Sequence, residues 1–229
     1  MPRALSFTPF NTMNIEQARF NMIEQQIRPW DVLNLGVLEL LAVVKREDFV
    51  PPEHRGMAFV DTEVPLPGGE CMLAPKVEAR LLQELAVHKH ERVLEIGAGS
   101  GYMAALLAHK AQHVTTLEID PKLAAFAAAN LKRAGVANVT VTTADASKAL
   151  PADGPFDVIV LSGSVAEVPE ALLAQLKVGG RLAAIVGFDP VMRALLIQRG
   201  ADHGLTRAVL FDTVAARLHG FKEPARFHF

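Results

Sequence analysis

Cysteine is almost absent from this sequence, and its scarcity excludes two ways of stabilising a protein. Cys71 is the only cysteine among the 229 residues. One cysteine cannot close an internal disulfide, and it cannot supply a zinc site built from cysteine ligands. Such a chain suits a reducing compartment, so we expect a cytoplasmic protein without a bound metal.

Strong charge and long apolar runs are also missing. The formal net charge is −2, which gives no basic footprint for nucleic acid. No segment approaches the roughly 20 apolar residues that span a bilayer, and residues 1–14 hold no apolar stretch typical of a secretory signal. We therefore expect no nucleic-acid or membrane partner and favour a small molecule or a peptide. The sequence leaves the oligomeric state open.

Hydrophobic residues, by contrast, are abundant. They make up 50% of the chain and charged residues 21%, so a large core can form and disorder is not expected. A chain of this length is within what one core can organise. We expect a single domain over residues 1–229, with an N-terminal helical region at 14–87 and an α/β core at 91–217.

The N-terminal region is predicted to be helical at both ends and irregular between them. Helices are expected at about 14–28, opened by Asn14 as a cap, and at 31–44, opened by Asp31. A third is expected at 76–87, just after Pro75. The passage between them is rich in proline and ends in two glycines, which predicts an extended segment.

From Arg92 onward, strand patterns alternate with helix patterns. Five strands are predicted, at 92–96, 113–118, 139–143, 156–161 and 181–186, with helices at 102–109, 121–134 and 168–176. Strands separated by helices pair in parallel. Two last runs, 194–198 and 206–214, predict an antiparallel hairpin at one edge. The predicted fold is α/β: a doubly wound, mostly parallel seven-stranded sheet with helices on both faces and a C-terminal antiparallel hairpin.

A glycine-rich turn follows the first of these strands. Gly97, Gly99 and Gly101 alternate between the strand and the next helix, in the order Glu95-Ile-Gly-Ala98-Gly-Ser-Gly. Glycine permits a tight turn and lets a ligand approach the backbone, and the start of the following helix favours an anionic group. Taken alone, the turn is equally typical of simple packing between a strand and a helix.

Two acidic residues at the same expected edge favour a binding site. Glu118 ends the second predicted strand, where α/β nucleotide sites place a carboxylate on ribose hydroxyls. Asp145 follows the third, where it can accept a hydrogen bond from an adenine amino group. Either acid alone is more typical of a solvated loop. The turn is not the G-x-G-x-x-G of dinucleotide sites, and the chain has no Lys-Ser/Thr phosphate loop.

The segment 95–101 resembles the first motif of class I S-adenosylmethionine-dependent methyltransferases, which have a Rossmann-like fold. That resemblance implies S-adenosylmethionine as cofactor, with Glu118 on the ribose and Asp145 on the adenine. It also implies a cofactor contact surface formed by Glu95, Gly97, Ala98, Gly99, Gly101, Glu118, Asp145 and Ala146. Segments 156–160 and 176–182 resemble the fourth- and fifth-strand motifs of the same class.

A closer resemblance covers about residues 21–214. The segments 50–52, 58–61, 65–68 and 74–75 are similar in order and spacing to protein-L-isoaspartate O-methyltransferases. That resemblance implies methylation of the free α-carboxylate of isoaspartyl residues in damaged proteins. The ester then cyclises to a succinimide that can reopen to aspartate. Residues 61–75 then form part of the acceptor cleft, as a substrate loop.

The substrate loop departs from the family pattern at its serine. The family carries a Thr-Ile-Ser-like run, whereas this chain has Cys71, Met72 and Leu73, so Leu73 stands at the serine position. A serine hydroxyl can donate to a carboxylate and leucine cannot. Ser162 and Ser164, after the fourth predicted strand, are candidate substitutes, although a loop serine is more typical of a local cap. The catalytic residue is therefore unknown.

Three functions remain open on these residues. The first is an O-methyltransferase acting on a carboxylate of a damaged protein or peptide. The second keeps the cofactor but changes the acceptor, and the third is a non-catalytic module that binds S-adenosylmethionine. Other candidates favour structural roles: Cys71 as a small packed residue, Trp30 as a core residue between the first helices, and His88 and His90 as surface residues.

Overall fold

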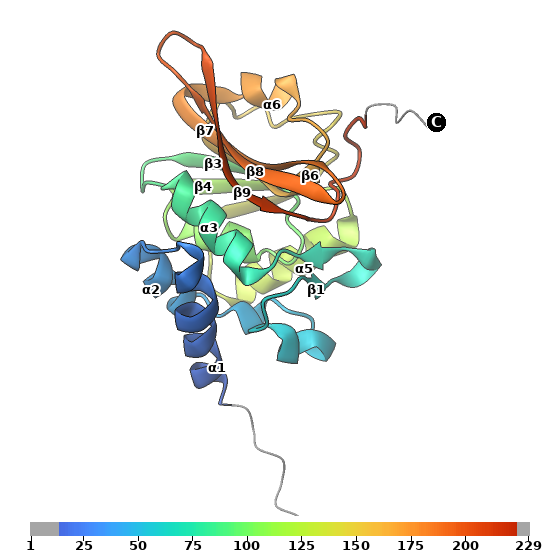
Figure 1. Cartoon of the computed structure of the whole chain (residues 1–229). Helices are drawn as coiled ribbons and strands as arrows, with labels where there is room; N and C mark the ends of the chain where they lie inside the picture. Colours follow the sequence, from blue (N-terminus) through green and yellow to red (C-terminus); the bar gives the residue numbers. More distant parts are fainter. Residues whose placement is uncertain (1–13, 224–229) are drawn as a thin grey trace, which may run out of the picture.

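A computed structural model describes residues 14–223, so both ends of the expected 1–229 domain lie outside the described residues. Its main feature is a seven-stranded sheet in the order β5-β4-β3-β6-β7-β8-β9. Figure 1 shows α3 on one side of this sheet and α6 on the other. No helix of the described part is long and apolar enough to cross a membrane.

The central strands are parallel, and the last three form antiparallel pairs. The strands are β3 (Arg92–Ile96), β4 (His113–Glu118), β5 (Val139–Thr143), β6 (Phe156–Val165), β7 (Leu176–Phe188), β8 (Val191–Arg199) and β9 (Leu205–Thr213). β3 pairs in parallel with β4 and β6, whereas β7 pairs antiparallel with β8 and β8 with β9. The predicted α/β fold, with its C-terminal hairpin, is confirmed.

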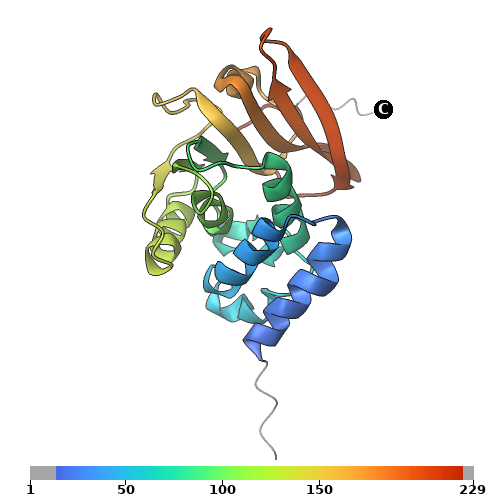
Figure 2. The same ribbon diagram turned by 90° about the vertical axis from the view of Figure 1, so that its left-hand side faces the viewer.

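Helices cover the two faces of the sheet unequally. One face packs against α3 (Pro75–Leu85), α4 (Tyr102–Ala108) and α5 (Pro121–Arg133), and the other against α6 (Glu170–Ala174). Neighbouring residues of β3 divide between the two cores, with Val93 in one and Leu94 in the other. Figure 2 shows the N-terminal helices on the far side of α3 from the strands. Both faces are buried, which explains the continuous apolar runs of the central strands.

The N-terminal helices differ from the prediction in their boundaries. α1 (Ile15–Asn21) begins after the Asn14 cap as predicted, but it continues as a π-helix (Met22–Ile27) and a 3-10 turn (Arg28–Trp30). α2 (Leu35–Val43) begins four residues after Asp31. Its cap is Asn34, whose side chain accepts from Val37 N at 3.2 Å. Asp31 has φ of 61°, a left-handed conformation that follows the 3-10 turn, so the prediction of its role as a cap was wrong.

Two further boundaries were wrong. Leu176 belongs to β7 and not to the preceding helix, and β7 begins five residues before the predicted strand at 181–186, so it includes Gly179 and Gly180. A Cβ at Gly180 would lie 2.8 Å from Lys177 O, so this first part of β7 is irregular and has a close backbone contact. A small sheet of β1 (Val64–Pro65) and β2 (Cys71–Met72) was not predicted. Strands of two residues are too short to show a period.

Candidate cofactor and acceptor site

The glycine turn at the end of β3 needs its glycines. Gly97, Gly99 and Gly101 have φ of 89°, 50° and 84°, values that side chains disfavour. A Cβ at Gly97 would also lie 2.7 Å from Leu218 Cδ2, and one at Gly99 3.3 Å from Leu66 Cδ1. The backbone of the turn therefore packs closely against Leu66, which precedes it in sequence, and Leu218, which lies near the C-terminus.

Glu118 lies directly on this turn. It ends β4, and its side chain is largely buried. Its Oε2 accepts from Gly99 N at 2.9 Å, and its Oε1 accepts from Asp120 N at 3.1 Å. The predicted proximity of Glu118 to the glycine turn is thus present, and the carboxylate holds the turn in place.

Asp145 lies at the same edge of the sheet, but its carboxylate is already engaged. Ala144 N donates to Glu118 O at 2.9 Å, which places the 144–146 segment beside the end of β4. The Asp145 carboxylate pairs with Lys148 at 2.7 Å and accepts from Ser147 Oγ at 2.6 Å. These bonds lower the pKa of Asp145 to about 2. Ala144 and Ala146 line the adjacent cavity, and Asp145 does not.

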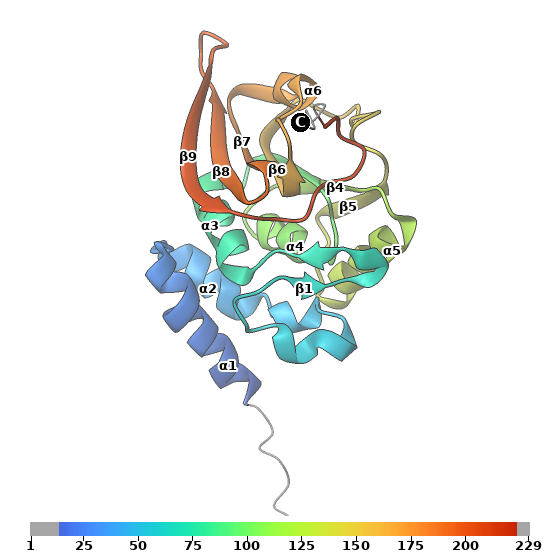
Figure 3. The same ribbon diagram turned by 45° about the vertical axis from the view of Figure 1, so that its right-hand side comes forward.

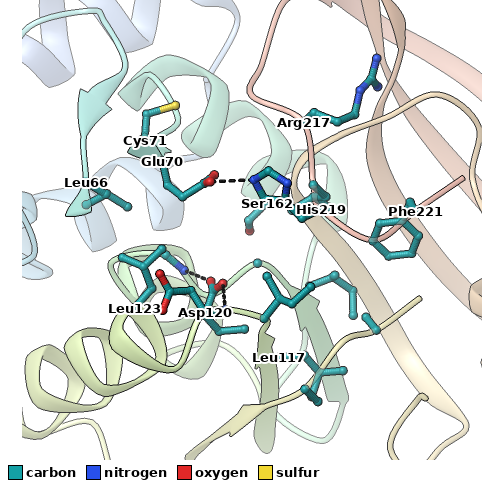
Figure 4. Close-up of a pocket in the computed structure, with 18 residues that line it drawn as sticks. Leu66, Glu70, Cys71, Leu117, Asp120, Leu123, Ser162, Arg217, His219 and Phe221 are labelled. Carbon is teal, nitrogen blue, oxygen red and sulfur yellow. Dashed lines mark hydrogen bonds and ion pairs between the residues drawn. The ribbon is translucent and has the colours of Figure 1, made fainter. Parts of the chain in front are cut away.

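The cavity lies at the carboxyl ends of the parallel strands, where ligands bind in open α/β sheets. Figure 4 shows residues from widely separated segments around it. It is lined by Gly97 and Gly99 of the glycine turn and by Glu118, Ile119 and Asp120. Apolar side chains on its walls include Leu66, Leu117, Leu123, Leu218 and Phe221. A second, smaller cavity behind the glycine turn is lined by both Leu73 and Ser162.

Residues 214–221, here called the C-terminal strap, close one side of the cavity. Figure 3 shows this chain leaving β9 and running between the sheet and β1. Ser164 N donates to Ala216 O at 2.7 Å, and Leu218 N donates to Ser164 O at 2.9 Å. His219 Nε2 lies 2.8 Å from Glu70 Oε1, which joins the strap to the substrate loop across the cavity (Figure 4).

Glu95 is a fully buried acid between β4 and β6. Its two carboxyl oxygens accept from Thr116 Oγ1 and Ser162 Oγ, each at 2.7 Å. Burial raises the pKa of Glu95 to about 8, with further raising contributions from the charges of Glu78 and Glu118. The group is therefore largely protonated at neutral pH.

The substrate loop is held from below by a buried arginine. Leu73 is 4% exposed, and its carbonyl accepts from Arg46 Nη2 at 2.7 Å. Arg46 also forms a buried ion pair with Glu78 of α3. Leu73 lines only the smaller cavity. The loop therefore keeps a fixed backbone although it carries no hydroxyl at this position.

The Cys71 thiol is not activated. Sγ donates to Glu63 Oε2 at 3.3 Å. Burial, together with the charge of Glu63, raises the pKa of Cys71 to about 12, so the reactive thiolate is scarce. Lys76 pairs with Asp61 at 2.7 Å. The interpretation of Cys71 as a packed residue agrees with these contacts.

Comparison with known proteins identifies the family. A sequence model of the protein-L-isoaspartate (D-aspartate) O-methyltransferase family matches residues 17–214. A protein-L-isoaspartate O-methyltransferase of Koribacter versatilis is 37% identical over 194 residues, which are 85% of this chain and 87% of that protein. One from Rhodopseudomonas palustris is 41% identical over 175 residues, 76% of this chain and 80% of that one. The chain belongs to the protein-L-isoaspartate O-methyltransferase family.

Solved structures agree with this family in fold. A candidate protein-L-isoaspartate O-methyltransferase of Plasmodium falciparum, in complex with S-adenosyl-L-homocysteine, has a TM-score of 0.76 and 22% identity. It covers 90% of this chain and 98% of its own. A second protein-L-isoaspartate O-methyltransferase has a TM-score of 0.74 and 25% identity, over 90% of this chain and 66% of its own.

The cavity fits the methyl donor of this family, S-adenosylmethionine. The backbone of Gly97 and Gly99 lines the cavity, so a ligand can approach the glycine turn closely. Apolar walls suit a purine, and the carboxylates of Glu70, Glu118 and Asp120 around the cavity suit a cationic ligand. The protein is thus a methyltransferase of the protein-L-isoaspartate O-methyltransferase family with a cavity of matching chemistry.

The sequence identified one half of this cavity and missed the other. The predicted site residues that line it are Gly97, Gly99, Glu118, Ala146, Cys71 and Ser162, whereas Arg217, Leu218, His219 and Phe221 were not predicted to do so. Asp120 also lines the cavity and is the N-cap of α5. Its place two residues after Glu118 was the one sequence signal that could have indicated this. No local pattern indicates that residues 214–221 return to β6.

The two candidate serines have different environments. Ser164 is fully buried and donates to Ala215 O at 2.8 Å, so its hydroxyl serves the strap. Ser162 lines both cavities.

His88, His90 and Trp30, which were expected to have structural roles, do not line the cavity. The ring centroids of His88 and His90 are 6.0 Å apart in a stacked arrangement, and the described residues contain no cluster suited to a metal ion. Trp30 is partly buried against the main hydrophobic core, as expected, and it also packs edge-on against Phe211 of β9 at 4.7 Å.

Proposed function

We propose that this protein transfers the methyl group of S-adenosylmethionine to the free carboxylate of an isoaspartyl residue in a damaged protein or peptide. The family match over residues 17–214 is the observation that carries this proposal. When bound, S-adenosylmethionine supplies an electrophilic methyl group on a sulfonium, so no protein nucleophile is required.

Each part of the cavity has a proposed role in holding the cofactor. Gly97, Ala98, Gly99 and Gly101, with Glu95 beneath them, hold the methionine end, and Glu118 holds the ribose. Asp145 and Ala146 hold the adenine. For Asp145 this role requires the carboxylate to give up Lys148 or Ser147, because both now occupy it. The backbone of Ala146, which lines the cavity, requires no such exchange.

The chain's task in catalysis is positioning. An acceptor carboxylate must be held in line with the methyl group while water is excluded, and correct orientation supplies much of the rate enhancement. The substrate loop and the C-terminal strap enclose the space beside the glycine turn, and His219 and Glu70 join them. We place the acceptor in this space, next to Cys71, Met72 and Leu73. A cytoplasmic location remains a prediction from the single cysteine.

Leu73 favours a second function, a changed acceptor. Without the family's hydroxyl, an isoaspartyl carboxylate loses one hydrogen-bond donor, and another carboxylate or hydroxyl compound can then compete for the space. A non-catalytic module that binds S-adenosylmethionine is the third alternative. Leu73→Ser would restore the hydroxyl. A gain of methyl transfer to isoaspartyl peptides in this variant would show that only the hydroxyl is missing.

A methyl-transfer assay on paired peptides tests the proposal. Two peptides of equal sequence would carry either isoaspartate or aspartate at one position, and labelled S-adenosylmethionine would report methyl incorporation. We expect kcat/KM for the isoaspartyl peptide to exceed that for the aspartyl peptide by at least about 100-fold, a discrimination of roughly 3 kcal/mol. Equal rates, or turnover only on small acceptors, would support the second function. Cofactor binding without any turnover would support the third.

A further inference from the structure

The loss of the loop serine leaves an unanswered question about the acceptor carboxylate, namely which side chain donates to it. Leu73 carries no polar atom beyond its backbone, and its carbonyl is already bonded to Arg46. Cys71 donates its thiol proton to Glu63. A replacement donor must carry a hydroxyl or N–H that faces the space beside the glycine turn.

Ser162 meets this requirement by position. It stands near the carboxyl end of β6 and is the one hydroxyl-bearing residue that lines both cavities formed by described residues at the glycine turn. It shares the smaller cavity with Leu73, the position of the family's serine. Figure 4 shows Ser162 between Glu70 and His219 on one side and Asp120 on the other.

The partner of Ser162 decides which way its proton points. Its Oγ lies 2.7 Å from Glu95 Oε1, and the other oxygen of Glu95 contacts Thr116 at 2.7 Å. The charged groups that act on Glu95 are Glu78, itself paired with Arg46, and Glu118. None of them is a cation in direct contact with Glu95, and the hydrogen bonds from Thr116 and Ser162 offset only part of the cost of an ionised carboxylate in this fully buried site.

In the structure Ser162 Oγ donates to Glu95 Oε1, and a proton on Oε1 of a neutral Glu95 would reverse this bond. A protonated carboxyl group can donate to Ser162 Oγ, which accepts while its own proton turns away from the acid. An ionised Glu95 would instead hold that proton as an acceptor. With the Glu95 proton on Oε1, the Ser162 hydroxyl, which lines both cavities, is free to donate into the cavity.

We propose that Ser162, oriented by Glu95, is the hydroxyl that binds the acceptor carboxylate in place of the absent loop serine. This inference rests on the proposed carboxyl methylation. In that reaction a carboxylate oxygen forms the new O–CH3 bond, and the electron pair of the broken S–CH3 bond remains on sulfur. No proton is transferred, and Ser162 donates to the oxygen that does not attack.

The change in charge on the acceptor during methyl transfer predicts which kinetic constant depends most on the Ser162 hydroxyl. The acceptor carboxylate is fully charged before transfer and loses charge as the methyl bond forms, so the Ser162 hydrogen bond is stronger in the bound ground state. Removing it should raise KM more than it lowers kcat. A hydrogen bond to a charged group is consistent with a loss of about 10- to 100-fold in acceptor affinity.

Four proteins test the proposal: the unmodified protein, Ser162→Ala, Ser162→Thr and the double variant Leu73→Ser/Ser162→Ala. The affinity for an isoaspartyl peptide would be measured by calorimetry in the presence of S-adenosylhomocysteine, with kcat and KM from methyl transfer. We expect Ser162→Ala to weaken peptide binding at least about 10-fold, Ser162→Thr to stay within about threefold, and the double variant to recover most of the loss. Affinity for S-adenosylhomocysteine and the melting temperature serve as controls for intact folding.

The outcomes separate the two proposals. If the unmodified protein methylates the peptide and Ser162→Ala binds it equally well, the role of Ser162 is wrong and the proposed function stands. If Ser162→Ala loses affinity but Leu73→Ser does not restore it, the serine acts through structure, and its donor role is also wrong. If the unmodified protein does not methylate isoaspartyl peptides, the proposed function fails, and the role of Ser162 fails with it.

Discussion

At the residue scale, burial decides the chemistry of the polar groups around the cavity. Glu95 and Cys71 both lie in desolvated positions without a cation, and both are held in their neutral forms. Glu118 and Asp145 instead accept hydrogen bonds from backbone or neighbouring groups. The pKa of Glu95 is thus raised and that of Asp145 lowered, although both acids belong to the same proposed site.

Cys71 should be nearly inert toward alkylation. With a pKa raised to about 12, roughly one thiol in 10,000 is ionised at pH 8, whereas an ordinary cysteine is substantially ionised. We expect iodoacetamide to modify native Cys71 at least about 100-fold more slowly than the same residue in the urea-unfolded chain. Mass spectrometry of the intact protein measures both rates. Comparable rates in the two states would contradict the burial of the thiol.

Glu95 should make the folded protein less stable as pH rises. Its pKa is about 8 when folded and near 4.3 when unfolded, so the folded state binds more protons between these values. The stabilisation present below pH 4.3 is therefore lost progressively as pH rises through 8, by an amount on the order of a few kcal/mol.

Glu95→Gln isolates this contribution, because glutamine keeps two polar atoms but does not titrate. We expect the free energy of unfolding in urea to fall less between pH 5 and pH 9 for the variant than for the unmodified protein. Other groups, such as His109, titrate alike in both proteins and cancel from the comparison. Parallel pH profiles would show that Glu95 is ionised throughout this range.

At the element scale, caps and turns were the features that the sequence predicted least well. Asp31 matches the general signature of a cap, but the 3-10 turn before it places it in a left-handed conformation, and Asn34 caps α2 instead. Neither outcome follows from local propensity, because the π-helical stretch that delays α2 depends on packing. The strands of the parallel core, in contrast, were located to within a few residues from their continuous apolar runs.

The correction at α2 can be tested by a matched pair of substitutions. Asn34→Ala removes the bond from Val37 N and should destabilise the protein by about 1 kcal/mol. Asp31→Gly introduces a residue that tolerates the φ of 61° at this position. It should change the free energy of unfolding by no more than about 0.5 kcal/mol. Urea unfolding measures both. A larger loss of stability for Asp31→Gly than for Asn34→Ala would indicate that Asp31, and not Asn34, caps α2.

The contact between the glycine turn and the strap gives a second prediction at this scale. Gly97→Ala meets two obstacles, a left-handed φ and a Cβ only 2.7 Å from Leu218 Cδ2. Gly135→Ala meets only the first, since φ there is 71° and nothing lies within 4 Å. We expect Gly135→Ala to cost about 1–2 kcal/mol and Gly97→Ala clearly more.

Leu218→Ala distinguishes the two obstacles. Added to Gly97→Ala, it removes the clash and should recover the part of the loss that exceeds the Gly135→Ala value. The double variant compared with each single variant by thermal unfolding gives this coupling. Strict additivity of the two substitutions would mean that the strap does not pack on the glycine turn.

At the scale of the whole molecule, the strap explains why only half of the cavity was predictable. The glycine turn and Glu118 lie within about 20 residues of each other in sequence and belong to one strand–helix–strand unit, a spacing that physical rules cover. Residues 214–221 reach the same place only because β8 runs antiparallel to β7 and β9 antiparallel to β8, so that β9 points in the same direction as β6 and the chain after it pairs with Ser164 of β6. That proximity is a property of the completed sheet, and no short pattern encodes it.

The substrate loop depends on the whole molecule in the same way. Its departure from the family at Leu73 is visible in the sequence, but the position of Ser162 behind it is not, because 89 residues separate the two positions. Parallel pairing of β3 with β6 brings Ser162 to the glycine turn. The sequence could therefore identify the missing hydroxyl, whereas its proposed replacement required the three-dimensional arrangement.

The central claim is that the cavity at the glycine turn binds the cofactor through Glu118. Calorimetric titration of S-adenosylhomocysteine into the unmodified protein, Glu118→Ala and Glu39→Ala tests it most directly, since Glu39 is an exposed acid on α2. We predict one saturable site per chain, weakened at least about 10-fold by Glu118→Ala and unchanged by Glu39→Ala. Equal affinity in all three proteins, or no binding to the unmodified protein, would contradict the account.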